Sequence, residues 1–455
     1  MIFEEVLNKV NNMRLYFGTQ ETKQIDFRLK NLHKLKSAIE QYQTRIADAL
    51  WKDLHKSFEE AYLTEFSLVD QEIKHHLKHL KQWSQPKSVP TPLHLLPSSS
   101  KIMYEPLGVG LIIAPWNYPF QLLINPLVGA IAAGCCAVLK PSPDCPNLSA
   151  IVEEMIRTTF PENYITVIEG GRETNEILLK LQFDCIFFTG SSAVGKVVMK
   201  AAAEYLTPVI LELGGKSPCI VDEDANLDIA AKRIVWGKTI NAGQTCIAPD
   251  YLFVHETVKE SLIAKMKAAI ESMYGNNEQQ SKFYARIVTD KAFERITEFL
   301  KEGKIRFGGK TDRADKYIQP TIIDEISTDS RIMKEEIFGP ILPVLSFSKL
   351  EETITYINSQ PKPLALYYFG NKKKGEEVIA KTSSGGGCIN DTLLHIGNHH
   401  LPFGGTGNSG IGKYHGKSSF LAFSNPRGIV VSSTLIDLPF KYAPFKFFNW
   451  IKRII

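Results

Sequence analysis

Short apolar runs alternate with stretches of helical character between residues 106 and 215. The runs are "GVGLIIAP", "CCAVLKP", "YITVIEGG", "CIFFTGS" and "PVILELGG". Strands that alternate with helices in this way form parallel sheets, in which ligands bind at the carboxyl ends of the strands. The alternation resumes after residue 246 with "YLFVHE", "PTIID" and "PILPVLSF". We therefore expect an α/β fold with two α/β units.

The first 83 residues have a different pattern. Apolar residues recur at intervals of three and four in "RLKNLHKLKSAIEQYQTRIADALWKDL", with charged residues between them. This spacing predicts amphipathic helices. The next stretch, residues 84–101, is rich in proline and serine, so we expect an extended segment or a loop.

Residues 106–139 contain no Asp, Glu, Lys or Arg and are long enough to cross a bilayer. Four prolines and the polar Trp116, Asn117, Gln121 and Asn125 interrupt them, and these side chains would lack partners in lipid. The stretch is better explained by a buried strand, a loop and a buried helix.

Composition excludes several classes of protein. The chain is 44% hydrophobic, and 53 basic residues nearly balance 49 acidic ones, which predicts a globular protein that binds no nucleic acid. Seven cysteines without CxxC spacing favour a reducing compartment. Since the N-terminus has no signal-peptide pattern, we expect a cytoplasmic protein.

Two glycine patterns imitate phosphate-binding motifs. "GSSAVGKV" (190–197) has P-loop spacing, but Val197 occupies the position of the magnesium-binding Ser or Thr. What remains is a strand that runs into a helix whose N-terminal amides could face a pyrophosphate. The second pattern, Gly405-x-Gly407-x-x-Gly410, lacks a clear βαβ context, so it does not support a dinucleotide site.

Histidines gather in two places. His75, His76 and His79 could share a helix face, and a second group contains His395, His399 and His400. Neither group has an adjacent carboxylate, and histidine spacing in a helix alone is a weak indication of a metal site. From the sequence we expect no metal.

One cysteine lies in a context unlike a protein core. In "NAGQTCIAPD" (241–250), Cys246 follows Gly, Gln and Thr, which suggests backbone close to a ligand, although an unreactive loop cysteine fits as well. Four further stretches carry chemistry-bearing residues: "APWNYPF", "VLKPS", "LELGGKSP" and "EEIFGP". The combination is far more specific than any of its parts.

Together these motifs resemble the aldehyde dehydrogenase superfamily, and "LPFGGTGNSGIGKYHGKSSFLAFS" resembles its class 3 branch, which includes the fatty aldehyde dehydrogenases. The resemblance implies an open Rossmann-like cofactor domain, an α/β catalytic domain and a small bridging segment used in dimerisation. The expected division is 1–83 and 102–212 for cofactor binding, 213–415 for catalysis, 84–101 and 416–438 for bridging and oligomerisation, and 439–455 for an amphipathic tail.

The resemblance also implies a reaction. Cys246 would attack an aldehyde to give a thiohemiacetal, Asn117 and the Cys246 N–H would bind the oxyanion, and hydride loss would leave a thioester. Glu212 would be the general base for hydrolysis. The expected activity is NAD(P)-dependent oxidation of aliphatic (medium- to long-chain) or aromatic aldehydes to carboxylic acids, in a homodimer.

The implied cofactor contacts are spread over several motifs. They are Lys140 and Glu336 for ribose hydroxyls, Phe338 near the nicotinamide, Gly190 and Ser191 for the pyrophosphate, Val194 near the adenine, and Trp116 and Leu213 alongside. Pro143 stands where the family often has a glutamate that accepts from the adenine ribose 2′-hydroxyl. Since a carboxylate there would repel a 2′-phosphate, the choice between NAD and NADP stays open.

Three other functions compete with this one. A CoA-acylating dehydrogenase of the same fold would release the thioester to a thiol and would not need Glu212. A non-catalytic binding protein would not need Cys246, Asn117, Glu212 and Glu336 together. A cysteine protease would need a histidine in a comparable motif, and the sequence offers none.

The last 17 residues, "PFKYAPFKFFNWIKRII", have an amphipathic pattern. A helix from Pro444 would gather aromatic and isoleucine side chains on one face and basic residues on the other, as in an interfacial membrane helix. The alternative is a tail that packs on a second subunit or on its own domain. The segment is too short to span a bilayer, and packing is favoured over peripheral membrane contact.

Overall fold

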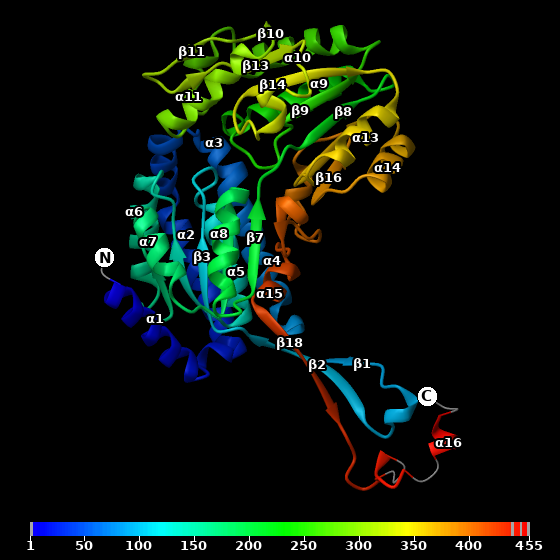
Figure 1. The fold of residues 1–455 in the computed structure, drawn as a ribbon. Coiled ribbons are helices and arrows are strands. Elements are labelled where there is room, and N and C mark those ends of the chain that lie inside the picture. Colours follow the sequence, from blue (N-terminus) through cyan, green and yellow to red (C-terminus); the bar gives the residue numbers. More distant parts are fainter. Residues whose placement is uncertain (1–2, 438–440, 446–447, 453–455) are drawn as a thin grey trace.

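Two sheets form the body of the protein in the computed structural model, which describes residues 3–437, 441–445 and 448–452 (Figure 1). The first sheet has six strands in the order β17-β7-β6-β3-β4-β5. Its strands are β3 (Val109–Ile113), β4 (Cys136–Lys140), β5 (Ile165–Val167), β6 (Cys185–Gly190), β7 (Val209–Leu213) and β17 (Gly410–Ile411). All five apolar runs predicted as strands before residue 215 are strands of this sheet.

The strands from β3 to β7 pair in parallel, and only β17 runs antiparallel, against β7. The register places Ile113 beside Lys140 and Gly190 beside Leu213, so the carboxyl ends meet at one edge. Helices that follow these strands cover the sheet, and every residue of β3 is buried as a result. They are α6 (Pro146–Thr159), α7 (Arg172–Leu179) and α8 (Ser192–Ala203).

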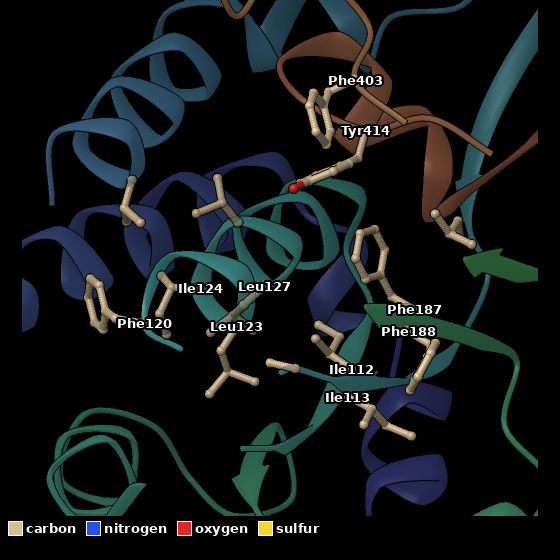
Figure 2. Packing of buried hydrophobic residues seen from close by; sticks show 14 of the residues in the cluster. Ile112, Ile113, Phe120, Leu123, Ile124, Leu127, Phe187, Phe188, Phe403 and Tyr414 are labelled. Atoms are coloured by element: carbon tan, nitrogen blue, oxygen red, sulfur yellow. The ribbon is translucent and has the colours of Figure 1, made fainter. Parts of the chain in front are cut away.

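The uncharged stretch is the interior of this unit. Helix α5 (Gln121–Ala133) lies between β3 and β4, and all of its residues are buried. Figure 2 shows Leu123, Ile124 and Leu127 of α5 close to the sheet. The expectation of a buried strand, a loop and a buried helix is confirmed, and no helix among the described residues is long and apolar enough to cross a membrane.

The N-terminal segment is helical, as its periodicity predicts. It comprises α1 (Phe3–Gly18), α2 (Ile25–Leu54), α3 (Phe58–Ala61), a π-helical turn (Tyr62–Phe66) and α4 (Ser67–Trp83). Helix α2 packs on α6, and α4 packs on α5. These helices cover the first sheet and bring the 56–75 region against the loop that precedes α5.

The second sheet has seven strands in the order β10-β13-β14-β9-β8-β15-β16. They are β8 (Pro218–Val221), β9 (Tyr251–His255), β10 (Lys304–Phe307), β13 (Thr321–Asp324), β14 (Ile341–Phe347), β15 (Ala365–Phe369) and β16 (Gly386–Ile389). Its helices are α9 (Leu227–Thr239), α10 (Lys259–Tyr274), α11 (Asp290–Glu298), α12 (Arg331–Lys334), α13 (Leu350–Ser359) and α14 (Lys372–Lys381). The two-stranded β11 (Thr311–Asp312) and β12 (Tyr317–Ile318) complete this second α/β unit.

A three-stranded sheet projects from the body (Figure 1). It contains β1 (Lys87–Val89), β2 (Ser99–Pro106) and β18 (Ser424–Val431), and β2 is its central strand. The Pro- and Ser-rich segment is therefore extended at both ends, with a short 3-10 turn at Leu93–Leu95 between them. Helix α15 (Lys417–Ala422) precedes β18 and packs on α5 in the body.

The C-terminal tail differs from a single helix that begins at Pro444. Residues 441–445 form turns, and the helix α16 covers only Phe448–Ile451. The rest of the predicted amphipathic helix, 446–447 and 453–455, lies outside the described residues.

Candidate active site

A cavity of about 780 Å³ lies between the two sheets, where β7 leads into the second unit. Its lining includes nine of the residues singled out from sequence: Trp116, Asn117, Gly190, Ser191, Glu212, Leu213, Cys246, Glu336 and Phe338. Lys140 and Val194 lie outside the lining. The structure thus gathers residues from five separate stretches of the chain at one place.

Cys246 follows a strained loop. Asn241 and Ala242 both have positive φ angles, of 52° and 51°, although neither is glycine. Residues held in this region cost about 1–3 kcal/mol each and cluster at functional sites. Gly243 must be glycine, because a Cβ there would lie 2.3 Å from the Gly339 carbonyl oxygen. The strain brings the thiol to the cavity wall.

Burial, and after it the nearby Glu336 and Glu212, raise the pKa of the Cys246 thiol to about 12. The N–H groups of Cys246 and Ile247 act in the opposite direction. At neutral pH the thiol is therefore protonated in the free enzyme. A thiolate forms only when another group takes the proton or a ligand changes this electrostatic environment.

The Asn117 side chain is buried, and its Nδ2 donates to the Gln244 carbonyl oxygen at 3.0 Å. The amide has a second N–H, which is available to the cavity. The Asn117 carbonyl oxygen accepts from Asn241 Nδ2 at 2.8 Å and from Lys56 Nζ at 3.1 Å. These bonds fix the backbone and the side chain of Asn117 to the loop that carries Cys246.

Lys56 belongs to a buried ion pair that supports this loop. Its ammonium lies 2.7 Å from Glu65 Oε1, and both side chains are fully buried. The other Glu65 oxygen accepts the N–H groups of Phe120 and Gln121, each at 3.0 Å, at the start of α5. The pair thus connects the N-terminal helices to both ends of the 117–121 segment.

Glu212 is in β7 and is 3% exposed. Among the described residues, neither of its carboxyl oxygens has a hydrogen-bond partner. Burial holds its pKa well above the usual value, and only the Lys413 ammonium lowers it. A buried carboxyl without fixed partners is suited to proton transfer, because no strong bond holds it in one protonation state.

Glu336 and Phe338 are held by two cations. Arg295 donates to the carbonyl oxygens of Glu336 and Ile337 at 3.0 and 2.8 Å, and Lys216 donates to Glu335 O at 2.8 Å. Phe338 has a φ of 49° and packs edge-on against Trp116, with ring centroids 5.3 Å apart.

The Glu336 carboxylate lies against Gly214. A Cβ at Gly214 would lie 2.2 Å from Glu336 Oε2, so glycine allows this approach. Burial and the nearby Asp250 raise the pKa of Glu336 to about 8.

The residues expected to bind the dinucleotide lie at the carboxyl edge of the first sheet. Lys140 ends β4, is 1% exposed, and makes one hydrogen bond among the described residues, to Pro141 O. Its remaining N–H groups can bind ribose hydroxyls. Ser191 caps α8, and Val194 in the first turn of that helix is 45% exposed, so an apolar ring could rest on it. These features fit a nicotinamide dinucleotide.

Glu169 is a carboxylate that the sequence motifs did not indicate. It follows β5, the strand next to β4, and is exposed. Burial lowers the pKa of Lys140 to about 8, while Glu169, and after it Asp144, raise it. Of these two carboxylates, Glu169 therefore acts more strongly on the Lys140 ammonium. No local pattern reveals it, since only the pairing of β4 with β5 brings it there.

Lys56, Glu65 and Arg295 were also missed from the sequence. Glu65 lies in a π-helical turn and Arg295 in α11, where charged residues are usual, and Lys56 lies in the short loop between α2 and α3. The sequence therefore gives no signal for the burial of Lys56 and Glu65 or for the contacts of Arg295. Tyr118 could have been noticed, because it directly follows Asn117, and its hydroxyl lies 2.6 Å from Thr245 Oγ1, beside Cys246.

A parallel sheet whose carboxyl edge fits a dinucleotide, next to a cavity that contains Cys246, is an arrangement that fits a dehydrogenase. Comparison with known proteins gives the family. Residues 4–429 match the Aldehyde dehydrogenase family, and the chain belongs to this family.

Individual relatives cover nearly the whole chain. The 4,4'-diaponeurosporen-aldehyde dehydrogenase of Staphylococcus aureus (strain NCTC 8325 / PS 47) is 49% identical over 98% of both chains. The dimeric NADP-preferring aldehyde dehydrogenase of Canis lupus familiaris is 43% identical over 96% of this chain and 97% of its own. The substrate-bound structure of Staphylococcus aureus AldH superposes with a TM-score of 0.95 at 48% identity, covering 98% of this chain and 99% of that one.

These findings establish the reaction class. The protein is an NAD(P)-dependent aldehyde dehydrogenase, as the motifs predicted, and its relatives support the class 3 branch.

Proposed function

We propose that Cys246 is the nucleophile and that Asn117 binds the oxyanion. Loss of the thiol proton and attack on the aldehyde carbon form a C–S bond and place negative charge on the former carbonyl oxygen. The Asn117 amide and the Cys246 N–H are the donors for that oxygen. The hydrogen bonds that fix Asn117 to the Cys246 loop support this assignment, because preorganised donors stabilise the oxyanion without further rearrangement.

Eight residues would hold the dinucleotide: Trp116, Lys140, Gly190, Ser191, Val194, Leu213, Glu336 and Phe338. When bound, NAD or NADP supplies the acceptor for the hydride that leaves the substrate carbon. Glu336 and Phe338 face the same cavity as Cys246, which supports their place at the nicotinamide end. Lys140 would bind ribose hydroxyls at the other end of the edge.

Glu212 would remove a proton from the water that cleaves the thioester. That water attacks the acyl carbon, the C–S bond breaks, and the carboxylic acid leaves with Cys246 restored as a thiol. Support comes from the two unpartnered oxygens of Glu212 and from its place in the cavity lining.

The substrate we propose is an aldehyde with a long apolar chain. The observation that supports this proposal is the apolar character of the cavity lining away from the cofactor edge. The apolar residues of this lining are Leu63, Leu68, Leu122, Trp236, Ile240, Met273, Phe283, Leu394, Ile396 and Phe403. Leu63 and Leu394 are more than half exposed, so the apolar surface continues to the rim. A hydrocarbon chain would bury this surface and gain about 0.8 kcal/mol per CH₂ group.

Steady-state kinetics with a series of saturated aldehydes tests this substrate class. We expect kcat/KM to rise with each added methylene by up to roughly fourfold, the factor that corresponds to about 0.8 kcal/mol. Benzaldehyde and 4,4'-diaponeurosporen-aldehyde belong in the same panel. A flat or falling series would contradict the proposal, and Leu63→Glu should reduce the slope while leaving acetaldehyde turnover unchanged.

We also propose the domain division 1–83 with 102–212, 213–415, and 84–101 with 416–438, in which the projecting sheet is the bridging and dimerisation segment. Strands β1 and β18 are its edges, and Val430 and Val431 are about half exposed. Unpaired edges and exposed valines favour pairing with a second copy. Sedimentation velocity should give a dimer that Val430→Arg weakens, whereas Leu15→Arg on α1 should not.

For the tail we propose packing on protein, with peripheral membrane contact as the alternative. Truncation after Tyr442 separates them. Flotation of the full-length protein, but not of the truncated one, with anionic liposomes at low salt would indicate membrane contact. If both stay in solution, the tail is a packing element.

A further inference from the structure

The two groups of histidines that are separate in sequence meet in the structure. His75 lies on α4, and His399 and His400 lie in the loop after the 3-10 turn Leu394–Gly397. One nitrogen from each of these three rings lies within 4.8 Å of the other two. The rings of His75 and His399 have centroids 4.2 Å apart, and those of His399 and His400 are 4.5 Å apart.

The loop is anchored close to α4 by other groups. Gly416 has a φ of 54°, and a Cβ there would lie 2.0 Å from the His399 carbonyl oxygen. The Gly416 N–H donates a hydrogen bond of 2.8 Å to the carboxylate of Glu72. Glu72 lies on α4, one turn before His75 and His76. The backbone on both sides of the cluster is therefore held in place, which keeps the three rings close together.

A second observation points to a ligand. His399 Nδ1 is buried and has no hydrogen-bond partner among the described residues. A buried nitrogen without a partner is costly, and a bound group would satisfy it.

We propose that His75, His399 and His400 form a binding site for a divalent transition-metal ion such as zinc. Three imidazole nitrogens and one water complete a tetrahedral shell, with Zn–N distances of about 2.0–2.1 Å. Nitrogens on such an ion are roughly 3.3 Å apart, so the rings must approach by about 1 Å or more, which small χ rotations allow. This site is separate from the residues that carry out aldehyde oxidation.

An ion at this position would affect the active-site cavity, because the elements that hold it also line the cavity. Leu394, Ile396 and Gly397 of the loop line the active-site cavity, and so do Leu68 and Gln71 of α4. A metal held between the loop and the helix would fix them together beside the proposed substrate channel. Metal binding should therefore slow amide hydrogen exchange in residues 394–400.

The test uses the untagged full-length chain in the Cys246→Ala background, because a polyhistidine tag or the active-site thiol would bind the probe. After treatment with EDTA, the protein is titrated with ZnCl₂ and bound zinc is measured by equilibrium dialysis. We expect about one Zn²⁺ per chain at this site. The double variant His399→Gln/His400→Gln should bind at least roughly tenfold more weakly, since even a second-shell change costs about 10–100-fold.

His33→Gln is the matched control, because His33 is an exposed histidine on α2 outside the cluster. His399 and His400 are preferred to buried His75 as positions to change, and circular dichroism and the melting temperature confirm that the variants fold. Zinc binding that is equal in the double variant and in His33→Gln would overturn the proposal. So would the absence of zinc binding in the parent chain, because the three rings would then serve only as packing against one another.

Discussion

Lys56 Nζ and Glu65 Oε1 lie 2.7 Å apart, with both side chains fully buried, and together they hold the segment that contains Asn117. The Lys56 ammonium also lies 4.3 Å from the centre of the Tyr118 ring. This pair comes from the N-terminal helices and makes no contact with Cys246 itself. If Asn117 binds the oxyanion as proposed, the pair acts on catalysis through Asn117, and we propose both of its members as positioning residues.

Lys56→Met should destabilise the protein strongly. The variant leaves the Glu65 carboxylate buried without its cation, which costs about 3–5 kcal/mol in other proteins. The midpoint of chemical unfolding measures the loss. Lys301→Met is the control, because Lys301 forms an exposed pair with Glu298 whose removal should cost less than about 1 kcal/mol.

The double variant Lys56→Met/Glu65→Leu separates stability from positioning. Apolar residues in place of a buried ion pair often restore stability, so the unfolding midpoint should recover in part. Recovery is incomplete because the N–H groups of Phe120 and Gln121 lose their acceptor. The Asn117 carbonyl still lacks one donor, so kcat should stay reduced by roughly tenfold, less than the 10²–10³ lost when an oxyanion donor is removed. Wild-type kcat in this variant would show that the pair acts on stability alone.

Cys246→Ala should abolish aldehyde oxidation and leave dinucleotide binding intact, because it removes the nucleophile and none of the proposed cofactor contacts. Absorbance at 340 nm and quenching of tryptophan fluorescence by the dinucleotide measure the two properties. Cys388→Ala is the control, since Cys388 is the other partly exposed thiol. Turnover by the Cys246→Ala protein above background would refute the assignment.

Glu212→Gln should slow hydrolysis of the thioester more than its formation. Acyl-enzyme should then accumulate on Cys246 and appear in intact-mass spectra as the mass of the acyl group. Addition of coenzyme A to wild-type enzyme tests the acylating alternative. Acyl-CoA as the main product would support that rival, and free acid as the main product would support the hydrolytic role of Glu212.

The rate of aldehyde oxidation should rise toward alkaline pH. Glu212 acts as a base only when deprotonated, and burial holds its pKa well above the usual value. The Cys246 thiol, with a pKa raised to about 12, also needs to lose its proton. Both shifts move the active forms to higher pH. The Cys246 shift should make kcat/KM increase across roughly pH 6 to 9, and the Glu212 shift should make kcat increase where hydrolysis limits turnover. Glu212→Gln should flatten the part of the kcat profile that reports hydrolysis.

Sequence patterns predicted the strands β3 to β7 of the first sheet and β9, β13 and β14 of the second, because each of these is a local apolar run. The patterns did not name β17 of the first sheet or β8, β10, β15 and β16 of the second. The uncharged strand β3 and the helix α5 are apolar on all sides, and burial on all sides is what the structure shows. The motifs around Cys246, Glu212 and Glu336 also predicted residues that share one cavity. In each case the residue type, the spacing and the expected chemistry all indicated the same site.

The features that were missed depend on contacts between distant segments. Glu65 and Phe120 are 55 positions apart, and nothing in either motif indicates their hydrogen bond. The His75 and His399 rings are brought together only by the fold, so the spacing of histidines in the sequence could not indicate that they are neighbours. Glu169 reaches the cofactor edge because β5 pairs with β4.

Cofactor preference should depend on Glu169. Pro143 leaves the usual position of the ribose-binding glutamate without a carboxylate, and Glu169 is the carboxylate that most affects Lys140. A carboxylate near the 2′ position favours NAD, because it accepts from a hydroxyl and repels a phosphate. In the wild type we expect the kcat/KM values for NAD and NADP to lie within roughly a hundredfold of each other.

Glu169→Gln should shift the ratio of kcat/KM values toward NADP by roughly tenfold, which corresponds to about 1.4 kcal/mol, because it removes the repulsion and keeps the side-chain shape. Asp144→Asn is the control and should have a smaller effect, since Asp144 acts less strongly on Lys140. Pro143→Glu should move the ratio the other way, toward NAD. A larger change from Asp144→Asn than from Glu169→Gln would transfer the role to Asp144, and no change from either would show that the 2′ position lies away from both carboxylates.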